Sequence, residues 1–215
     1  MTSKLRNKLI NIAKDKITNH DRSHDFYHAL RVLNNAEGIV EYEGGDLDII
    51  VPAALFHDIV CYQKNHPKSN DSSEESAETT KEILENIDEF PRKKIGTVFE
   101  AINQCSFSKS INPNTLEAKI LQDADRLEAT GAISIMRTFS STGQMERPFY
   151  HPTDPFCRLR KPDSKKQALD LFYSRLLVVQ DRMHTKYAKK LAKKRTKFLK
   201  QFLKELAWEL GDISC

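Results

Sequence analysis

The chain has 215 residues, of which 39% are hydrophobic and 30% are charged, and its formal net charge is +4. This composition is ordinary for a folded globular protein and excludes a disordered or fibrous chain. The length fits one domain with a substantial core, and so small a net charge does not by itself indicate a polyanionic partner. We therefore predict a single domain that spans residues 1–215.

The sequence contains no segment that we expect to enter a membrane. Its densest apolar run, IIVPAALF, is much shorter than the roughly 18 residues that a spanning helix needs. The N-terminal segment carries charges among its apolar positions and lacks a small-residue cleavage site, so it does not resemble a signal peptide. The four cysteines are far apart and form no CxxC pair, which predicts reduced thiols in a cytoplasmic protein.

The dominant period of the sequence is helical, beginning with its first half. Apolar residues recur at steps of three and four between Leu5 and Ala13, which predicts a first amphipathic helix of about four turns. We expect a second helix after a cap at Asp21 or Ser23. Its inner face is predicted to contain Phe26, Leu30, Leu33, Ala36 and Val40. A third helix is expected over residues 47–60.

The second half continues in the same way. Residues 77–105 are expected to form two helices, and residues 116–139 two short helices that meet near Gly131. Four of the eight prolines fall within residues 140–163, which predicts a long loop. From residue 165 to 210 we expect two helices, the second of them long. Because no strand-period segment of useful length occurs, the predicted fold class is all-α, a compact single-domain helical bundle.

Three features of the sequence can carry chemistry, and the first is the pair His57-Asp58. It follows the apolar segment VPAALF, which places it at the end of a buried helix. A buried carboxylate without a partner is costly, and a metal ion would relieve that cost. A helix end with a capping carboxylate explains the pair equally well, and two other His-Asp pairs in the chain show how little the dipeptide says alone.

The second feature is the segment LQDADRLEATGA, in which Asp123 and Asp125 interrupt an apolar run. Positions two residues apart lie on nearly opposite sides of a helix, so we expect only one of these side chains to be buried. The buried carboxylate is either the structural partner of an arginine, Arg126 or Arg137, or a metal ligand.

The third feature is His28, four residues after His24 on the same helix face. This spacing can bind a metal, although two solvated histidines are the better interpretation of that pair alone. Taken together, the three features supply two imidazoles and two carboxylates. Such a site suits Mn²⁺, Fe²⁺, Co²⁺ or Ni²⁺ better than Mg²⁺, which prefers oxygen ligands. It would lower the pKa of a bound water and polarise a phosphoryl oxygen, as phosphoester hydrolysis requires.

The order His28, His57-Asp58, Asp125 resembles the H…HD…D signature of the HD-domain metal-dependent phosphohydrolase superfamily. The segments SHDFYHALRVLNNA, AALFHDI, EESAE, LQDADRLEATGAISIMRTF and RPFY resemble a subgroup of small, stand-alone, bacterial-type members, some of which act on nucleoside triphosphates. The resemblance covers nearly the whole chain, and DADRLEATGAI is its most specific part. It implies an enzyme with the all-α fold of the HD domain.

Carried over position by position, the resemblance implies that one divalent metal ion is bound by His28, His57, Asp58 and Asp125. Mn²⁺ is favoured, with Fe²⁺, Co²⁺, Ni²⁺ or Mg²⁺ as alternatives. The chain lacks the additional histidines of two-metal members. His66 lies in a polar loop and is not expected to be a ligand.

The resemblance also suggests catalytic and substrate-binding residues. Besides Asp58, the catalytic candidates are His24, as a proton donor or phosphate ligand, and Glu75, as the base for the attacking water, with Glu74 as a close rival. The candidates for binding substrate are Arg22, Arg31 and Lys109. A solvated surface role is the alternative for each of these residues, although for His24 and Lys109 we favour the functional role.

The last predicted helix is strongly basic, with nine Lys or Arg residues from Lys186 to Lys204. A surface for nucleic acid or an anionic membrane is one interpretation. An ordinary amphipathic helix with solvated lysines explains the same spacing, because apolar residues recur on its other face. We favour this second interpretation and expect neither a nucleic-acid nor a membrane partner; a homodimer is compatible with the sequence.

These observations predict a divalent-metal-dependent phosphohydrolase that uses a metal-activated water on a small-molecule nucleotide or phosphoester. Cleavage of a nucleoside triphosphate to a monophosphate and pyrophosphate is the expected reaction. Two alternatives stay open: a phosphodiesterase acting on a cyclic nucleotide or an RNA end, and a non-catalytic module that binds nucleotides or nucleic acid.

Overall fold

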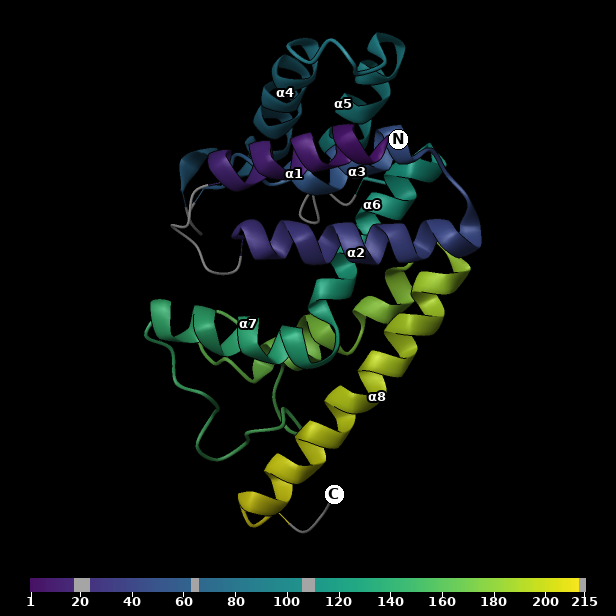
Figure 1. The fold of residues 1–215 in the computed structure, drawn as a ribbon. Coiled ribbons are helices and arrows are strands. Elements are labelled where there is room, and N and C mark those ends of the chain that lie inside the picture. The colour runs from purple at the N-terminus through teal and green to yellow at the C-terminus, as the bar shows by residue number, and fades with distance from the viewer. Residues whose placement is uncertain (18–23, 63–65, 106–110, 213–215) are drawn as a thin grey trace. The chain divides into compact units, whose positions relative to one another are not determined.

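The regular structure of the described residues is entirely helical, as the sequence predicts (Figure 1). The computed structural model describes the chain except for residues 18–23, 63–65, 106–110 and 213–215. Across these described ranges it contains no strand. None of their helices is long and apolar enough to cross a membrane. The chain divides into two compact units, residues 1–125 and 126–215, which are described separately.

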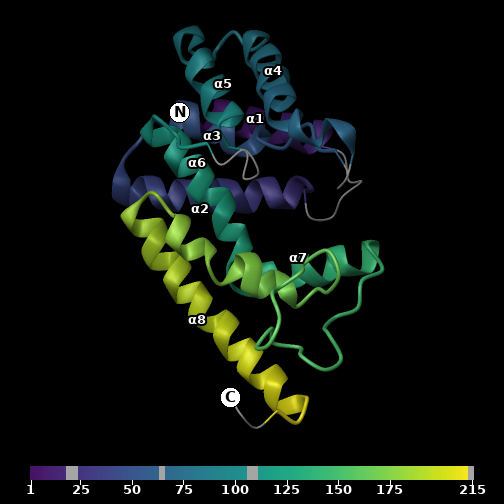
Figure 2. The ribbon, with the colours of Figure 1, turned by 180° about the vertical axis from the view of Figure 1, so that it is seen from behind.

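The first unit is built around α3, the most apolar helix of the chain. Every residue of α3 from Ile49 to Phe56 is buried, which explains the short run without polar positions. Helices α1, α2, α4 and α5 all contact it, and α4 and α5 lie side by side in both views (Figures 1 and 2). The helices of this unit are α1 (Ser3–Lys16), α2 (Phe26–Glu43), α3 (Leu47–Phe56), η1 (Pro67–Asn70), α4 (Ser72–Glu85), η2 (Arg92–Lys94), α5 (Ile95–Asn103) and α6 (Leu116–Arg126), whose last residue begins the second unit.

The start and inner face of α2 differ from the prediction. The side chain of Asp25, not Asp21 or Ser23, caps the helix by accepting a hydrogen bond of 2.9 Å from the backbone N–H of His28. Asp21 and Ser23 lie outside the described residues. The buried residues of α2 are His28, Ala29, Val32, Leu33, Ala36 and Ile39, whereas the predicted Phe26, Leu30 and Val40 are only half-buried. The buried face of α2 therefore includes His28. A prediction that counts only apolar residues omits this histidine and places the buried face partly on the wrong side of the helix.

The second unit holds the basic helix and a long irregular segment (Figure 2). Its helices are η3 (Leu127–Ala129), α7 (Gly131–Gln144), the π-helix η4 (Phe172–Leu176), η5 (Val179–Arg182) and α8 (Lys186–Glu209). Helix α7 extends into the predicted loop. The first of the two predicted C-terminal helices is replaced by η4 and η5, in which Phe172, Leu176 and Val179 are buried. In α8 the lysines are exposed, as the amphipathic interpretation expects, but the predicted apolar face is wrong: Tyr187, Leu191, Phe202 and Leu206 are only half-buried and Phe198 is exposed. The buried stripe consists of Ala188, Ala192, Thr196, Leu199, Leu203 and Ala207.

Two polar side chains hold the irregular segment of the second unit. Arg147 donates hydrogen bonds to the hydroxyls of Ser141 and Thr142 at the end of α7, and to the backbone carbonyl of Ser164. Asp170, whose side chain is completely buried, accepts hydrogen bonds from both terminal nitrogens of Arg160. These bonds satisfy buried polar groups that a loop of this length would otherwise leave without partners.

Candidate metal centre

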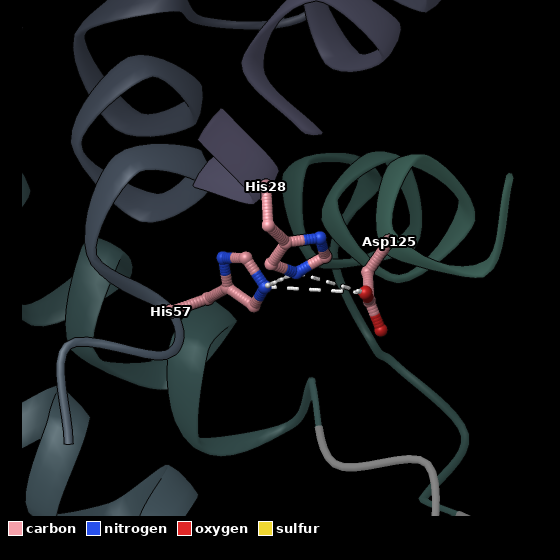
Figure 3. A group of neighbouring side chains, drawn as sticks. All are labelled: His28, His57 and Asp125. Atoms are coloured by element: carbon pink, nitrogen blue, oxygen red, sulfur yellow. Dashed lines mark hydrogen bonds and ion pairs between the residues drawn. The ribbon is translucent and has the colours of Figure 1, made fainter. Parts of the chain in front are cut away.

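Two buried imidazoles face each other in the first unit. His28 lies in the first turn of α2 and is 1% exposed, and His57 directly follows α3 and is 3% exposed. Their Nε2 atoms are 3.3 Å apart, as Figure 3 shows. The cap at Asp25 fixes the turn that carries His28, and the end of the central helix fixes His57. Both rings are therefore held by well-packed helices.

The hydrogen bond of His57 determines which of its nitrogens can bind a metal. Its Nδ1 lies 2.9 Å from the backbone carbonyl oxygen of Ala54 in the last turn of α3. A carbonyl only accepts, so Nδ1 carries the hydrogen and donates it. In the neutral ring, Nε2 then presents a free lone pair toward His28. A hydrogen bond of this kind orients many metal-binding histidines.

Two carboxylates complete the group from separate elements. Oδ1 of Asp125, near the end of α6, lies 3.6 Å from Nε2 of His28 and 3.9 Å from Nε2 of His57 (Figure 3). Oδ2 of Asp58 lies 3.6 Å and 3.4 Å from the same two nitrogens. The Asp125 and Asp58 side chains are 23% and 34% exposed, so the imidazoles are buried while the carboxylates keep access to solvent.

These contacts pair opposite charges. Burial alone would lower the pKa of His57, but the carboxylates of Asp58 and Asp125 outweigh burial and raise it to about 9. Burial would raise the pKa of Asp58, but His57 and the hydrogen bond from His28 hold it well below its usual range. The two acids thus favour positive charge between the imidazoles.

The donor set fits a divalent cation. One ligand atom each from His28, His57 and Asp125 lies within 4.8 Å of the others, and Asp58 adds a second carboxylate beside both rings. Metal–ligand bonds of about 2.0–2.2 Å separate neighbouring ligand atoms by about 3.0–3.5 Å, close to the distances found here. Two imidazoles with two carboxylates are a mixed nitrogen and oxygen set that first-row transition ions accept.

The other predicted catalytic residues have varied surroundings. The ring of His24 lies edge-on to that of His28, with 5.6 Å between centroids, and its charge helps to lower the pKa of Asp58. The carboxylate of Glu75 accepts a hydrogen bond of 2.5 Å from the hydroxyl of Tyr62. Glu74, by contrast, is exposed.

The predicted substrate-binding residues are described only in part. Arg31 is half-buried in the second turn of α2, whereas Arg22 and Lys109 lie outside the described residues. His66, which we did not expect to be a ligand, is exposed and stacks on the ring of Tyr62. Tyr62 itself was not predicted, because a contact between Tyr62 and Glu75 depends on how the chain folds back after Asp58.

The structure shows which of the two neighbouring carboxylates, Asp123 and Asp125, is buried and which lies near the imidazoles. Asp123 is completely buried, and Asp125 is the one that faces the imidazoles. As predicted, only one of the two is fully buried, but it is not the candidate ligand. The alternative partners lie in the second unit, where Arg137 pairs with Glu128 at 3.8 Å and Arg126 donates to the carbonyl of Arg182.

Comparisons with known proteins agree with this geometry. Residues 25–130, which contain all four candidate ligands, match the family model of the HD domain. The Bacillus subtilis protein YpgQ is 30% identical over 181 residues, which cover 81% of this chain and 78% of YpgQ. The chain belongs to the HD-domain family.

Solved structures of the family extend the similarity over almost the whole chain. The crystal structure of Bacillus subtilis YpgQ in complex with ADP has a TM-score of 0.74 and 28% identity, covering 99% of this chain and 98% of that one. An HD-superfamily hydrolase from Bacillus thuringiensis has a TM-score of 0.73 and 31% identity, covering 97% of each chain. The Lin1889 protein from Listeria innocua has a TM-score of 0.72 and 32% identity, covering 97% and 99%. These similarities support the interpretation of the chain as a hydrolase of the HD superfamily.

Proposed function

We propose that the protein is a metal-dependent phosphohydrolase that acts on nucleotides. The observation that carries this proposal is the convergence of His28, His57, Asp58 and Asp125, from three separate helical regions, on one small volume. Among the described residues, the contacts of the two carboxylates are with imidazoles and not with a lysine or arginine. Carboxylates grouped in this way support the binding of a cation from solution.

A divalent cation held by these residues would make a water molecule more nucleophilic and would polarise a phosphoryl oxygen. The chain contributes the orientation of the ligands: the Ala54 carbonyl sets the tautomer of His57, and the Asp25 cap sets the start of α2. We propose that His24, whose ring lies beside that of His28, hydrogen-bonds a phosphate oxygen or donates a proton to the leaving group. Mn²⁺ is our preferred ion because the donors are mixed, with Fe²⁺, Co²⁺, Ni²⁺ and Mg²⁺ as alternatives.

The nucleotide substrate is supported by the ADP complex of the similar protein YpgQ. We propose that a nucleoside triphosphate is cleaved to a monophosphate and pyrophosphate. We propose that Arg31 on α2 neutralises phosphate charge. The same role for Arg22 and Lys109, which lie outside the described residues, stays a prediction. A phosphodiester substrate and a purely binding role are the alternatives that experiment must separate. The cytoplasmic location and the homodimer also stay predictions.

A panel of nucleoside triphosphates, diphosphates, cyclic nucleotides and generic phosphoesters, each with Mn²⁺, Co²⁺, Ni²⁺ or Mg²⁺, tests the proposal. Phosphate and pyrophosphate are measured separately. We expect pyrophosphate release from triphosphates with Mn²⁺, and no activity in Asp58→Ala. Asp88→Ala is the matched control, because Asp88 is fully exposed.

Full metal-dependent hydrolysis by Asp58→Ala would refute the ligand assignment, and activity only on phosphodiesters would favour the first alternative, a phosphodiesterase. Nucleotide binding without turnover under any of these ions would favour the second.

A further inference from the structure

The polypeptide directly after Asp58 is fastened to α4 by two sets of side-chain contacts. Ser76 is completely buried, and its hydroxyl bonds to both backbone groups of Val60: it accepts from the N–H at 3.1 Å and donates to the carbonyl at 3.2 Å. Val60 follows Asp58 by only two residues. Ser76 therefore holds the start of α4 against the segment that carries the His57-Asp58 pair.

The second set involves Glu75, the residue before Ser76. Tyr62 donates a hydrogen bond from its hydroxyl to Oε2 of Glu75 at 2.5 Å. The ring of Tyr62 is in turn stacked on His66, with 4.6 Å between centroids and 6° between planes. Lys68 lies 3.9 Å from the other oxygen, Oε1, but is well exposed and so makes a weak pair. The carboxylate thus has one oxygen held by a short hydrogen bond, and one oxygen with only a loose partner.

We propose that Tyr62 is a positioning residue that orients Glu75 as the general base for the attacking water. The proposal rests on the proposed function and deepens it. It also distinguishes Glu75 from Glu74, which is exposed and lies on a different side of α4. The hydroxyl of Tyr62 fixes Oε2, so that Oε1 is presented in one orientation without the carboxylate having to be ordered during each turnover.

In this step the water oxygen forms a new bond to phosphorus while one of its protons passes to Oε1 of Glu75. The bridging P–O bond breaks, and the leaving phosphate oxygen keeps the electron pair of that bond. The second proton of the water stays on the product phosphate, and Glu75 then returns its proton to solvent or to the leaving group. No other reactant is consumed.

The hydrogen bond can be tested without any turnover. Hydrogen bonding to Glu75, together with partial burial and the charge of that carboxylate, raises the pKa of Tyr62. Ultraviolet titration of the tyrosines should show one group with a raised pKa that is absent in Tyr62→Phe. Glu75→Gln should return that pKa toward its ordinary value, and Glu74→Gln should leave it raised. An unchanged Tyr62 titration in Glu75→Gln would overturn the proposal.

A kinetic double-mutant cycle tests the role in catalysis. Glu75→Gln should lower kcat by about a hundredfold or more, the usual contribution of a general base. Tyr62→Phe keeps the ring on His66 and should lower kcat about tenfold, as expected for one hydrogen bond to a charged group, with KM and Mn²⁺ affinity unchanged. In the Glu75→Gln background, Tyr62→Phe should have almost no further effect. Tyr42→Phe, at an exposed tyrosine, is the matched control, and thermal unfolding checks that each variant is folded.

The outcomes separate this proposal from the proposed function. If Tyr62→Phe keeps full kcat, or lowers kcat equally in both backgrounds, Tyr62 does not act through Glu75. If Glu75→Gln keeps full kcat while Asp58→Ala is inactive, the metal-dependent function stands and only the base assignment is wrong. If Asp58→Ala is also fully active, the proposed function itself fails.

Discussion

Two carboxylate clusters, one in each unit, show how a structural acid differs from a functional one. In the second unit, Asp170 is completely buried, and each of its oxygens accepts a hydrogen bond from Arg160. Oδ1 also accepts from the thiol of Cys157, and Oδ2 also accepts from the backbone N–H of Asp163. In the first unit, Asp58 and Asp125 keep partial access to solvent and face two imidazole nitrogens. Asp170 is paired with Arg160, which is always positively charged. Asp58 and Asp125 lie instead beside the imidazoles of two histidines, which can bind a metal ion in their neutral form.

The difference lies in where the compensating charge comes from. A buried carboxylate that is bonded by an arginine and by backbone N–H groups needs nothing further and stabilises a loop. The carboxylates of Asp58 and Asp125 favour positive charge beside the two imidazoles, which a divalent cation from solution can supply. Substitution of Asp170 should therefore mainly lower the stability of the protein, whereas substitution of Asp58 or Asp125 should mainly lower its activity.

The largest effect is expected at the metal centre. Asp125→Ala should lower nucleotide hydrolysis by about 10⁴-fold, because the loss of a bound metal removes several kcal/mol of transition-state stabilisation. The variant should still fold, because Asp125 is partly exposed and its ion-pair contacts within the described part of the chain are with the imidazoles of His28 and His57. Initial rates and circular dichroism of the same sample would check both statements. Activity within tenfold of the wild type would remove Asp125 from the metal centre.

The next effect concerns the thiol beside Asp170. Burial, the hydrogen bond to Asp170 and the charge of that carboxylate raise the pKa of Cys157 to about 12. Because the thiolate is the reactive form, Cys157 should be alkylated about a thousandfold more slowly than the exposed Cys61 near pH 8. Mass-spectrometric mapping after timed iodoacetamide labelling measures both rates in one sample. Equal rates would mean that the Asp170 cluster is open in solution.

Removing the charge of Asp170 should cost stability. Asp170→Asn is expected to lower the free energy of unfolding by about 3 kcal/mol, because Arg160 loses its buried partner. Burial alone would raise the pKa of Asp170, but the bonds from Arg160 and Asp163 outweigh burial and lower it.

The pH dependence of this stability follows from the direction of the shift. A carboxyl whose pKa is lowered by folding contributes its full stability above the unfolded value of about 3.9 and loses it as the pH falls through the folded value. Denaturant unfolding at several pH values should therefore show the wild type and Asp170→Asn converging in acid. A constant difference down to the lowest pH would contradict the ion-pair account of Asp170.

The smallest effect is expected at the cap of α2. Asp25→Ala removes the hydrogen bond to the N–H of His28 and should destabilise the protein by about 1 kcal/mol. Because that turn carries the candidate ligand His28, Mn²⁺ affinity should fall slightly as well. Asp88→Ala, at a fully exposed residue, provides the comparison in both measurements. A loss of affinity as large as that of Asp125→Ala would mean that Asp25 acts on the metal itself.

The sequence predicted which side chains meet at the candidate metal centre better than it predicted the helix ends that carry them. The order His28, His57-Asp58, Asp125 identified four residues that the structure brings together, because the family motif records which helices converge. It did not reveal that Asp25 is the cap, since several Asp and Ser residues near a helix start have equal local propensity. Only the structure shows that α2 begins at Phe26, which makes Asp25 the capping residue.

Contacts between distant segments were harder to foresee. The choice between Glu74 and Glu75 depends on the register of α4 against Val60 and Tyr62, and no periodicity in the sequence encodes that register. Helix α3 ends at Phe56, rather than near Val60 as predicted, and the backbone groups of Val60 are bonded by the side chain of Ser76 instead. The apolar spacing between α7 and α8 predicted a regular helix and did not indicate that the backbone there forms π and 3₁₀ turns.

We propose that the chain holds one divalent cation between His28, His57, Asp58 and Asp125. Titration of the metal-free protein with Mn²⁺, followed by electron paramagnetic resonance of the free ion, measures this directly. We expect one tightly bound ion per chain, lost in His57→Ala and retained in the surface control Asp88→Ala. Equal Mn²⁺ binding by wild type and His57→Ala, or no binding by the wild type, would contradict it.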